Sequence, residues 1–504
     1  MLKSAFCFSG KTVTLTLFLF SLYIPQTNAQ KFEFDRELKT IYEDITQLNL
    51  ERAETSIASY KTDNPNNFLV YHVENYIDFF RCFIDEDYEY FKSIRNQKDE
   101  RLSKIQEGDK SSPYYNFSQA EILLQWALVR LKFEEYTTAL LEMNRAISLL
   151  EENDKLFPNF IANKKSLSAL HALVGTIPES YKNILSWVSS FNGSIEQGYN
   201  EIKEVEDKMA IDEFPFASEV LVIKSLIELH ILNRSELAYK SSQSEYLDPF
   251  QNPLLCFIVA NIAHNAGKND EAIHILESYK PTLSQHPLYY LDYLKGIYKL
   301  NRLDTDSDLY IRRYLNYFQG RHYIKEAYQK LAWHAWVIEG DSVEYRRNMT
   351  FCLLKGEDLI DEDKQAQNLA HQKILPNRTL LKVRLLSDGA YLNEALAELE
   401  QLDSSDLTLN HAIEYAYRKA RILQNLGRYQ EAIESYQQCL SFSYNEDLYY
   451  QIASHFYLGQ VYEVQNEYQS ANFHYNKCLE SKSTQYQRSL HQKAKVGLLR
   501  LKSK

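Results

Sequence analysis

The chain has 504 residues, of which 14 are glycine and 11 are proline, a share of about 5% where roughly 12% is usual. Sandwiches, barrels and propellers need many tight turns, which use these two residues heavily, so the composition excludes such folds. Hydrophobic residues make up 45% of the chain and charged residues 25%, ordinary values for a protein with a large buried core.

Residues 1–29 have the pattern of a secretory signal peptide. Lys3 and Lys11 precede an apolar run from Val13 to Ile24. The residues that end at Ala29 fit the cleavage site of a signal peptidase. The apolar run is about 12 residues long, shorter than the roughly 20 that span a membrane. We therefore expect an exported chain that begins at Gln30, without a transmembrane segment in the mature chain. The expected location is the periplasm; secretion or peripheral association with the outer membrane is the alternative.

The charge balance of the mature chain argues against nucleic acid as a partner. Two of the 56 basic residues lie in the signal segment, which leaves 54 basic against 68 acidic residues, a net charge of −14. Nucleic-acid binding needs a basic footprint, so we expect none. The remaining cysteines are widely spaced and form no CxxC pair, so we expect small core residues rather than a disulfide framework. They are Cys82, Cys256, Cys352, Cys439 and Cys478.

Two segments near the end of the chain repeat each other at an offset of 39 residues. The first, from Ala416 to Leu440, reads AYRKARILQNLGRYQEAIESYQQCL. The second, from His455 to Leu479, reads HFYLGQVYEVQNEYQSANFHYNKCL. Small residues stand at aligned positions, where they would let two helices approach closely: Ala420 with Gly459, and Ala432 with Ala471. A residue that tolerates the left-handed conformation follows each first helix, Gly427 in one copy and Asn466 in the other.

This pattern resembles the tetratricopeptide repeat (TPR), a helix–turn–helix unit of 34 residues. The resemblance implies an all-α fold, an α-solenoid of TPR-like repeats, and covers roughly three-quarters of the mature chain. Weaker copies precede the two best ones, at Leu50–Asn67, Ala120–Leu150, Asn252–Tyr279 and Leu380–Leu402, with degenerate pairs at Tyr289–Gln319 and Ala327–Leu354.

One stretch departs from the helical period, because Pro178, Gly193 and Gly198 interrupt it. Over a short length this stretch, together with the segment beginning at Asn252, is similar to the inclusion-body-clearance family of TPR proteins. We expect it to be an elbow between two superhelical halves. The expected organisation is N-terminal repeats over 30–170, an irregular connector over 171–210, degenerate repeats over 211–380, and C-terminal repeats over 381–504 that end in a capping helix at Gln487–Leu501.

No catalytic, cofactor-binding or metal-binding motif is found. The 13 histidines include no HExxH pattern, and the sequence contains no GxSxG, Walker or GxGxxG motif. We therefore expect a non-enzymatic protein without cofactor or metal. Two alternatives are an exported glycan- or nutrient-binding accessory protein and a helical-superhelix hydrolase. The first usually has long Gly/Asn/Pro-rich excursions and the second a Gly/Ser-rich domain after the superhelix, and the sequence has neither.

The resemblance implies a scaffold that binds a partner protein or peptide in its concave groove, which the first helix of each repeat lines. Side chains on that face without a packing role are the candidate contacts. In the two best repeats they are Tyr417, Arg421, Gln424, Phe456, Gln460 and Glu463. The alternative is that these residues are merely exposed at a seam. Nothing in the sequence indicates the oligomeric state.

Overall fold

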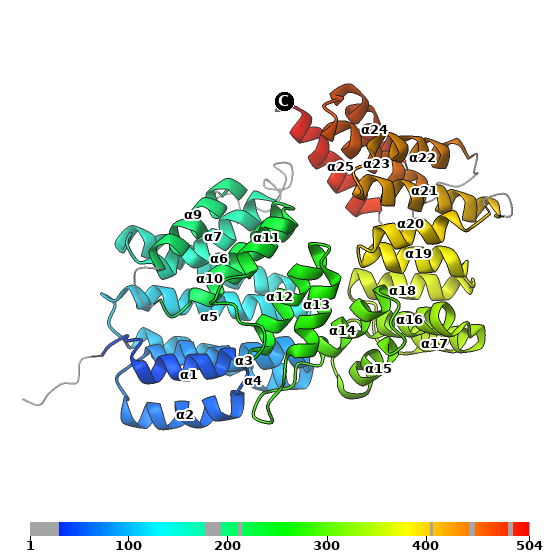
Figure 1. Ribbon diagram of the computed structural model, residues 1–504. Coiled ribbons are helices and arrows are strands. Elements are labelled where there is room, and N and C mark those ends of the chain that lie inside the picture. Colours follow the sequence, from blue (N-terminus) through cyan, green and yellow to red (C-terminus); the bar gives the residue numbers. More distant parts are fainter. Residues whose placement is uncertain are drawn as a thin grey trace, which may run out of the picture.

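The computed structural model describes residues 30–176, 193–209, 214–403, 407–442, 449–481 and 487–502, and the predicted signal peptide lies outside them. Over these residues helices follow one another, and the one extended pairing described is an isolated bridge between Lys31 and Asn67. Successive helices pack in pairs, which confirms the predicted all-α solenoid (Figure 1).

The first part of the chain forms the N-terminal stack, α1 to α13. Its helices are α1 (Arg36–Thr46), α2 (Leu50–Asp63), α3 (Leu69–Asp85), α4 (Tyr88–Gln106), α5 (Pro113–Lys132), α6 (Tyr136–Leu156), α7 (Ile161–Gly175), α9 (Ile195–Met209), α10 (Ala217–Leu226) with a π-helical turn η1 (Ile227–Ile231), α11 (Ser235–Ser242), α12 (Pro253–Asn265) and α13 (Asn269–Ser278).

The rest of the chain forms a linking region, α14 to α18, and the C-terminal stack, α19 to α25. These helices are α14 (Tyr290–Asn301), α15 (Ser307–Tyr317), α16 (Ile324–His334) with η2 (Ala335–Glu339), α17 (Ser342–Leu354), α18 (Asp361–Gln372), α19 (Arg378–Asp388), α20 (Leu392–Glu400), α21 (Leu409–Asn425), α22 (Tyr429–Ser441), α23 (Tyr449–Val464), α24 (Tyr468–Glu480) and α25 (Gln487–Lys502).

In the C-terminal stack, large rings pack against positions that carry no side chain. A Cβ atom at Gly459 would lie 2.5 Å from the Tyr475 ring, and one at Gly497 would lie 2.6 Å from it. Tyr475 is fully buried as a result, held between α23 and the last helix α25. Gly427 and Asn466 adopt φ angles of 75° and 62°, which confirms the predicted left-handed turns.

The five cysteines all lie buried as free thiols. Burial raises the pKa of the Cys439 thiol to about 11 and that of Cys256 to about 12, so both stay protonated at neutral pH. The prediction that they serve as small core residues is confirmed.

The stretch expected to be an irregular connector differs from that expectation in its described part. Helices α7 and α9 form a further packed pair, and a Cβ atom at Gly198 would lie 2.4 Å from the carbonyl oxygen of Ser168. The glycine therefore permits a close helix contact instead of breaking a helix. Of the other two expected interruptions, Gly193 lies just before α9, where a Cβ atom would lie 2.8 Å from the Cα atom of His171, and Pro178 lies outside the described residues.

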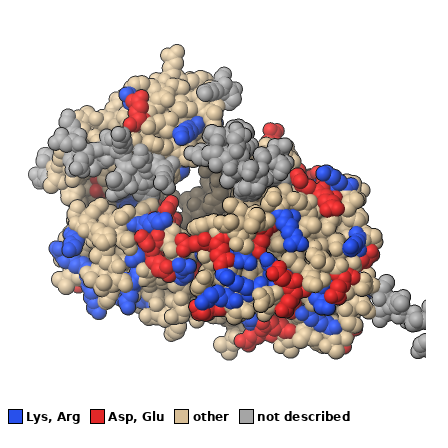
Figure 2. Space-filling model, turned by 180° about the vertical axis from the view of Figure 1, so that it is seen from behind, with Lys and Arg blue, Asp and Glu red and all other residues tan. Residues whose placement is uncertain are grey.

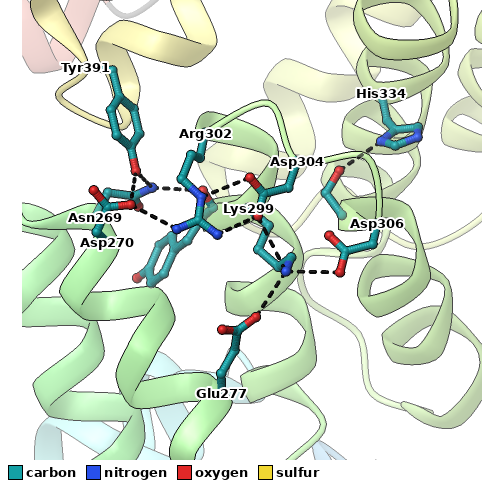
Figure 3. Close-up of polar contacts among 11 residues, drawn as sticks. Asn269, Asp270, Glu277, Lys299, Arg302, Asp304, Asp306, His334 and Tyr391 are labelled. Atoms are coloured by element: carbon teal, nitrogen blue, oxygen red, sulfur yellow. Dashed lines mark hydrogen bonds and ion pairs between the residues drawn. The ribbon is translucent and has the colours of Figure 1, made fainter.

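The chain changes direction farther on, in the linking region. Helix α19 packs against α14, and Figure 1 shows the N-terminal stack to the left of the linking region and the C-terminal stack rising at the upper right. Figure 3 shows the polar contacts that tie the turn after α19 to α13: Asp270 accepts hydrogen bonds of 2.9 Å from the Tyr391 hydroxyl and from Arg302. Arg302 also pairs with Asp304, and Asn269 donates to the Tyr391 oxygen at 3.1 Å.

Aromatic rings and ion pairs fill the core between the helices of the N-terminal stack. Phe216, just before α10, is completely buried among rings of the first helices. The buried ammonium of Lys165 on α7 lies 3.0 Å from Glu121 on α5 and 2.6 Å from Glu219 on α10. Tyr76 on α3 donates to the same Glu219 at 2.8 Å. Ion pairs and aromatic contacts therefore occupy the space between the first helices.

Another long-range contact, which we name the closure, joins the end of α3 to the loop between α15 and α16. Glu86 is buried, with a φ of 55°, and one of its carboxylate oxygens accepts the backbone N–H groups of Arg321 and His322 at 2.7 and 2.9 Å. Its other oxygen lies 2.7 Å from the Lys132 ammonium and 2.9 Å from the His322 ring. One carboxylate thus connects segments that lie 235 residues apart in the sequence.

This closure predicts a specific pH dependence of stability. Burial alone would raise the pKa of Glu86, but His322 and Lys132 hold it at about 2, below the ordinary 4.5. Because the pKa is lowered by folding, the carboxylate stabilises the fold above about pH 4.5, and this contribution is lost as the pH falls toward 2. The stability difference between the wild type and Glu86→Gln should therefore shrink by about 2 kcal/mol between pH 7 and pH 3.

Urea unfolding of both proteins at the two pH values measures that difference. Glu89→Gln is the control, because this exposed carboxylate lies near Glu86 on the same turn. It should change stability by well under 1 kcal/mol at either pH. A Glu86→Gln effect that stays the same from pH 7 to pH 3 would contradict the assignment.

Candidate partner-binding surface

The first helices of the C-terminal stack contact one another in order, α19 with α21, α21 with α23, and α23 with α25. On α21 and α23 they expose a set of half-buried aromatic and charged side chains, which we name the tyrosine–arginine surface. It consists of Glu414, Arg418, Arg421, Tyr449, Tyr450 and Tyr457.

Stacked groups give this surface a fixed shape. The Arg421 guanidinium lies 3.6 Å from the centroid of the Tyr457 ring, well within cation–π distance. Beneath it, the buried Tyr417 ring has its centroid 5.2 Å from that of Tyr450 and 6.0 Å from that of Tyr449. Rings held by neighbours on both helices lose little further conformational freedom when a partner binds, which favours binding.

The two arginines of the surface differ in how their charge is balanced. Arg418 Nε lies 2.7 Å from the Glu414 carboxylate, one helical turn away. Burial alone would raise the pKa of Glu414, but Arg418 holds it below the usual value, so the pair is charged and mutually neutral. Among the described residues Arg421 has no carboxylate in ion-pair range; it donates to Gln424 at 3.2 Å and stacks on Tyr457.

The six side chains predicted to contact a partner divide into two groups. Tyr417, Phe456 and Glu463 are buried, with 7%, 4% and 9% of their surfaces exposed. Glu463 accepts a hydrogen bond of 2.7 Å from Tyr475 and pairs with Arg500 of α25. The expectation that these three have no packing role is therefore wrong, because their side of each helix faces the neighbouring helices.

The other three predicted side chains remain partly accessible. Arg421, Gln424 and Gln460 are half-buried, and Gln424 accepts a hydrogen bond of 2.6 Å from the Tyr436 hydroxyl. Whether they contact a partner stays a prediction. Sequence reasoning missed Tyr449, Tyr450 and Tyr457, although the last two are seven residues apart and hence share a helix face. That spacing could have identified Tyr450 and Tyr457.

Neither a candidate metal site nor a membrane-spanning helix is found among the described residues. Among them, no three His, Cys, Asp or Glu side chains converge on a point where they could hold a metal ion. Within the same residues, no helix combines the length and the apolar character needed to cross a bilayer.

Comparison with known families agrees with this geometry. Residues 411–483 match the family model described as tetratricopeptide repeat, and this range takes in nearly all of α21 through α24. The matched helices are the ones that carry the tyrosine–arginine surface. No curated protein matches the chain.

The division of the six residues predicts distinct effects on stability. Tyr417→Ala and Phe456→Ala should each destabilise the C-terminal stack by about 3–5 kcal/mol, because each leaves a cavity among packed rings. Gln460→Ala should cost less than about 1 kcal/mol, since its side chain is only half-buried. Urea unfolding followed by circular dichroism measures these changes. If Tyr417→Ala were as mild as Gln460→Ala, the packing role assigned to Tyr417 would be wrong.

Proposed function

We propose that this chain is a non-enzymatic scaffold whose C-terminal stack binds a segment of a partner protein on the tyrosine–arginine surface. The observation that carries the proposal is the set of three ordered tyrosine rings beside Arg421, whose charge no described carboxylate neutralises. Tyrosine and arginine are the side chains that most often dominate the energy of protein interfaces. The TPR match over the same helices supports a role in protein interaction.

Two further features bear on where the partner binds. In the N-terminal stack, Phe216 and the ion pairs of Lys165 are buried between the helices, where they serve packing and are inaccessible to a ligand. In the C-terminal stack, the side chains of the tyrosine–arginine surface are half-buried and thus partly accessible. A partner segment with an acidic or aromatic side chain would complement Arg421 and the rings beside it.

We also propose that the protein works outside the cytoplasm, in the periplasm. The support for this part is the charge, length and cleavage pattern of residues 1–29. The partner would then be another exported or outer-membrane protein.

Site-specific photo-crosslinking in the source organism tests the binding proposal. Benzoylphenylalanine in place of Tyr450 should crosslink a discrete partner, whereas the same group in place of Gln438, exposed on α22, should not. Arg421→Gln should reduce the crosslinked yield at least about tenfold, because it removes the charge but keeps much of the side chain. A thermal melt of each variant verifies that it is folded. Equal crosslinking from both positions, or a yield unaffected by Arg421→Gln, would contradict the proposed surface.

A further inference from the structure

A cavity of about 840 Å³ lies where the N-terminal stack closes against the linking region. The turns after α3 and α5 form one side, and the end of α15 with the residues after it forms the other. Glu86 is part of the lining, so the contact that closes the two segments also shapes the cavity. This volume is within the range of sites that hold drug-sized ligands, larger than a single side chain needs.

Aromatic rings form much of the wall. Tyr289 and Tyr317 stack with their centroids 5.6 Å apart, and Tyr88 lies 5.7 Å from Phe133 across the floor. Tyr88 and Tyr317 are 42% and 58% exposed, so their rings are accessible to a ligand. Exposed tyrosine rings in a concave setting attract cations through the negative face of the ring.

The charge of the lining favours the same kind of ligand. Six carboxylates line the cavity against the single guanidinium of Arg321: Asp85, Glu86, Asp87, Glu89, Glu134 and Glu357. Two lysines outside the lining pair with two of these carboxylates: Lys132 with Glu86, and Lys92 with Glu89. Arg321 pairs with Glu357. With histidines neutral, an excess of three negative charges remains (six carboxylates against Arg321, Lys92 and Lys132).

The protein already makes one such contact at the cavity wall. The Lys92 ammonium lies 5.0 Å from the centroid of the Tyr88 ring and 2.7 Å from Glu89, combining an aromatic face with a carboxylate. Across the cavity from each other, Tyr317 at the end of α15 and Glu134 after α5 are exposed as well. Glu134 lies 3.7 Å from the Arg321 guanidinium, so a cation between it and Tyr317 would share this carboxylate with Arg321. Figure 2 shows the back of the molecule, where acidic and basic residues are intermixed around a central hollow.

We propose that this acidic–aromatic cavity binds a lysine- or arginine-bearing segment of a partner protein. The cationic side chains lie between the tyrosine rings and the carboxylates, and the segment runs across the solvent-facing mouth. This site is separate from the tyrosine–arginine surface, so the proposal does not depend on whether a partner binds to that surface. Its ligand is basic, whereas the C-terminal surface presents Arg421, whose charge no carboxylate of the described residues balances, and suits an acidic partner.

Fluorescence anisotropy with the mature chain, residues 30–504, tests the proposal. The probe is a fluorescein-labelled ten-residue peptide in which lysine and arginine alternate with glycine, and the matched probe has glutamine at each basic position. The basic peptide should bind saturably, and more weakly as salt is raised from 50 to 300 mM. The glutamine peptide should bind at least tenfold more weakly.

Variants locate the binding. Tyr317→Ala with Glu134→Gln should weaken the basic peptide at least tenfold, because the pair removes an exposed ring and a carboxylate from the cavity. The matched control, Phe473→Ala with Glu480→Gln on α24, removes the same kinds of exposed group elsewhere and should leave binding unchanged. Thermal melts verify that all variants are folded.

Three results would overturn the proposal. The first is the absence of saturable binding by the basic peptide, and the second is equal loss of affinity in the cavity and control variants. The third is binding of spermine that is as tight as that of the peptide and equally sensitive to Tyr317→Ala with Glu134→Gln. That result would reassign the cavity to small polyamines.

Discussion

Glu86 is the point on which the arrangement of this solenoid depends. A chain of helix pairs contacts only its neighbours along the sequence, so nothing in the repeat itself fixes where distant pairs lie. Here one buried carboxylate accepts two backbone N–H groups and pairs with Lys132 and His322, joining α3 to the loop before α16. The left-handed backbone at Glu86 directs the side chain into that contact. The cavity exists because these segments meet.

A second tie sets the position of the C-terminal stack. Tyr391 and Arg302 both donate to Asp270, and α19 packs on α14 beside them. Ion pairs and rings fill the core of the N-terminal stack, and two sets of accessible polar and aromatic groups remain in the described part of the molecule as candidate binding surfaces. One set is the acidic cavity at the closure, and the other is the tyrosine–arginine surface. The two surfaces differ in charge, which suits them to different partner segments.

Local features were predictable from the sequence, and long-range ones were not. The helix pairs follow from small residues at fixed spacing, such as Ala432, Ala471 and Gly459, because close helix contact demands them. The exposure of the candidate partner contacts was harder to predict, because one residue along a helix rotates a side chain by about 100°. Tyr417 is therefore buried whereas its neighbour Arg418 is half-buried. No periodic pattern in the sequence indicates the contact between Glu86 and Arg321. Gly198 was expected to interrupt a helix, but it permits a close contact between two helices.

Hydrogen exchange at Arg321 and His322 tests the closure most directly. Both residues lie between helices, where backbone amides usually exchange quickly. The account predicts slow exchange of these two amides in the wild type, because both donate to buried Glu86, and fast exchange in Glu86→Ala while α21 to α24 keep their protection. Fast exchange of both amides in the wild-type protein would contradict the closure, and with it the cavity that the closure forms.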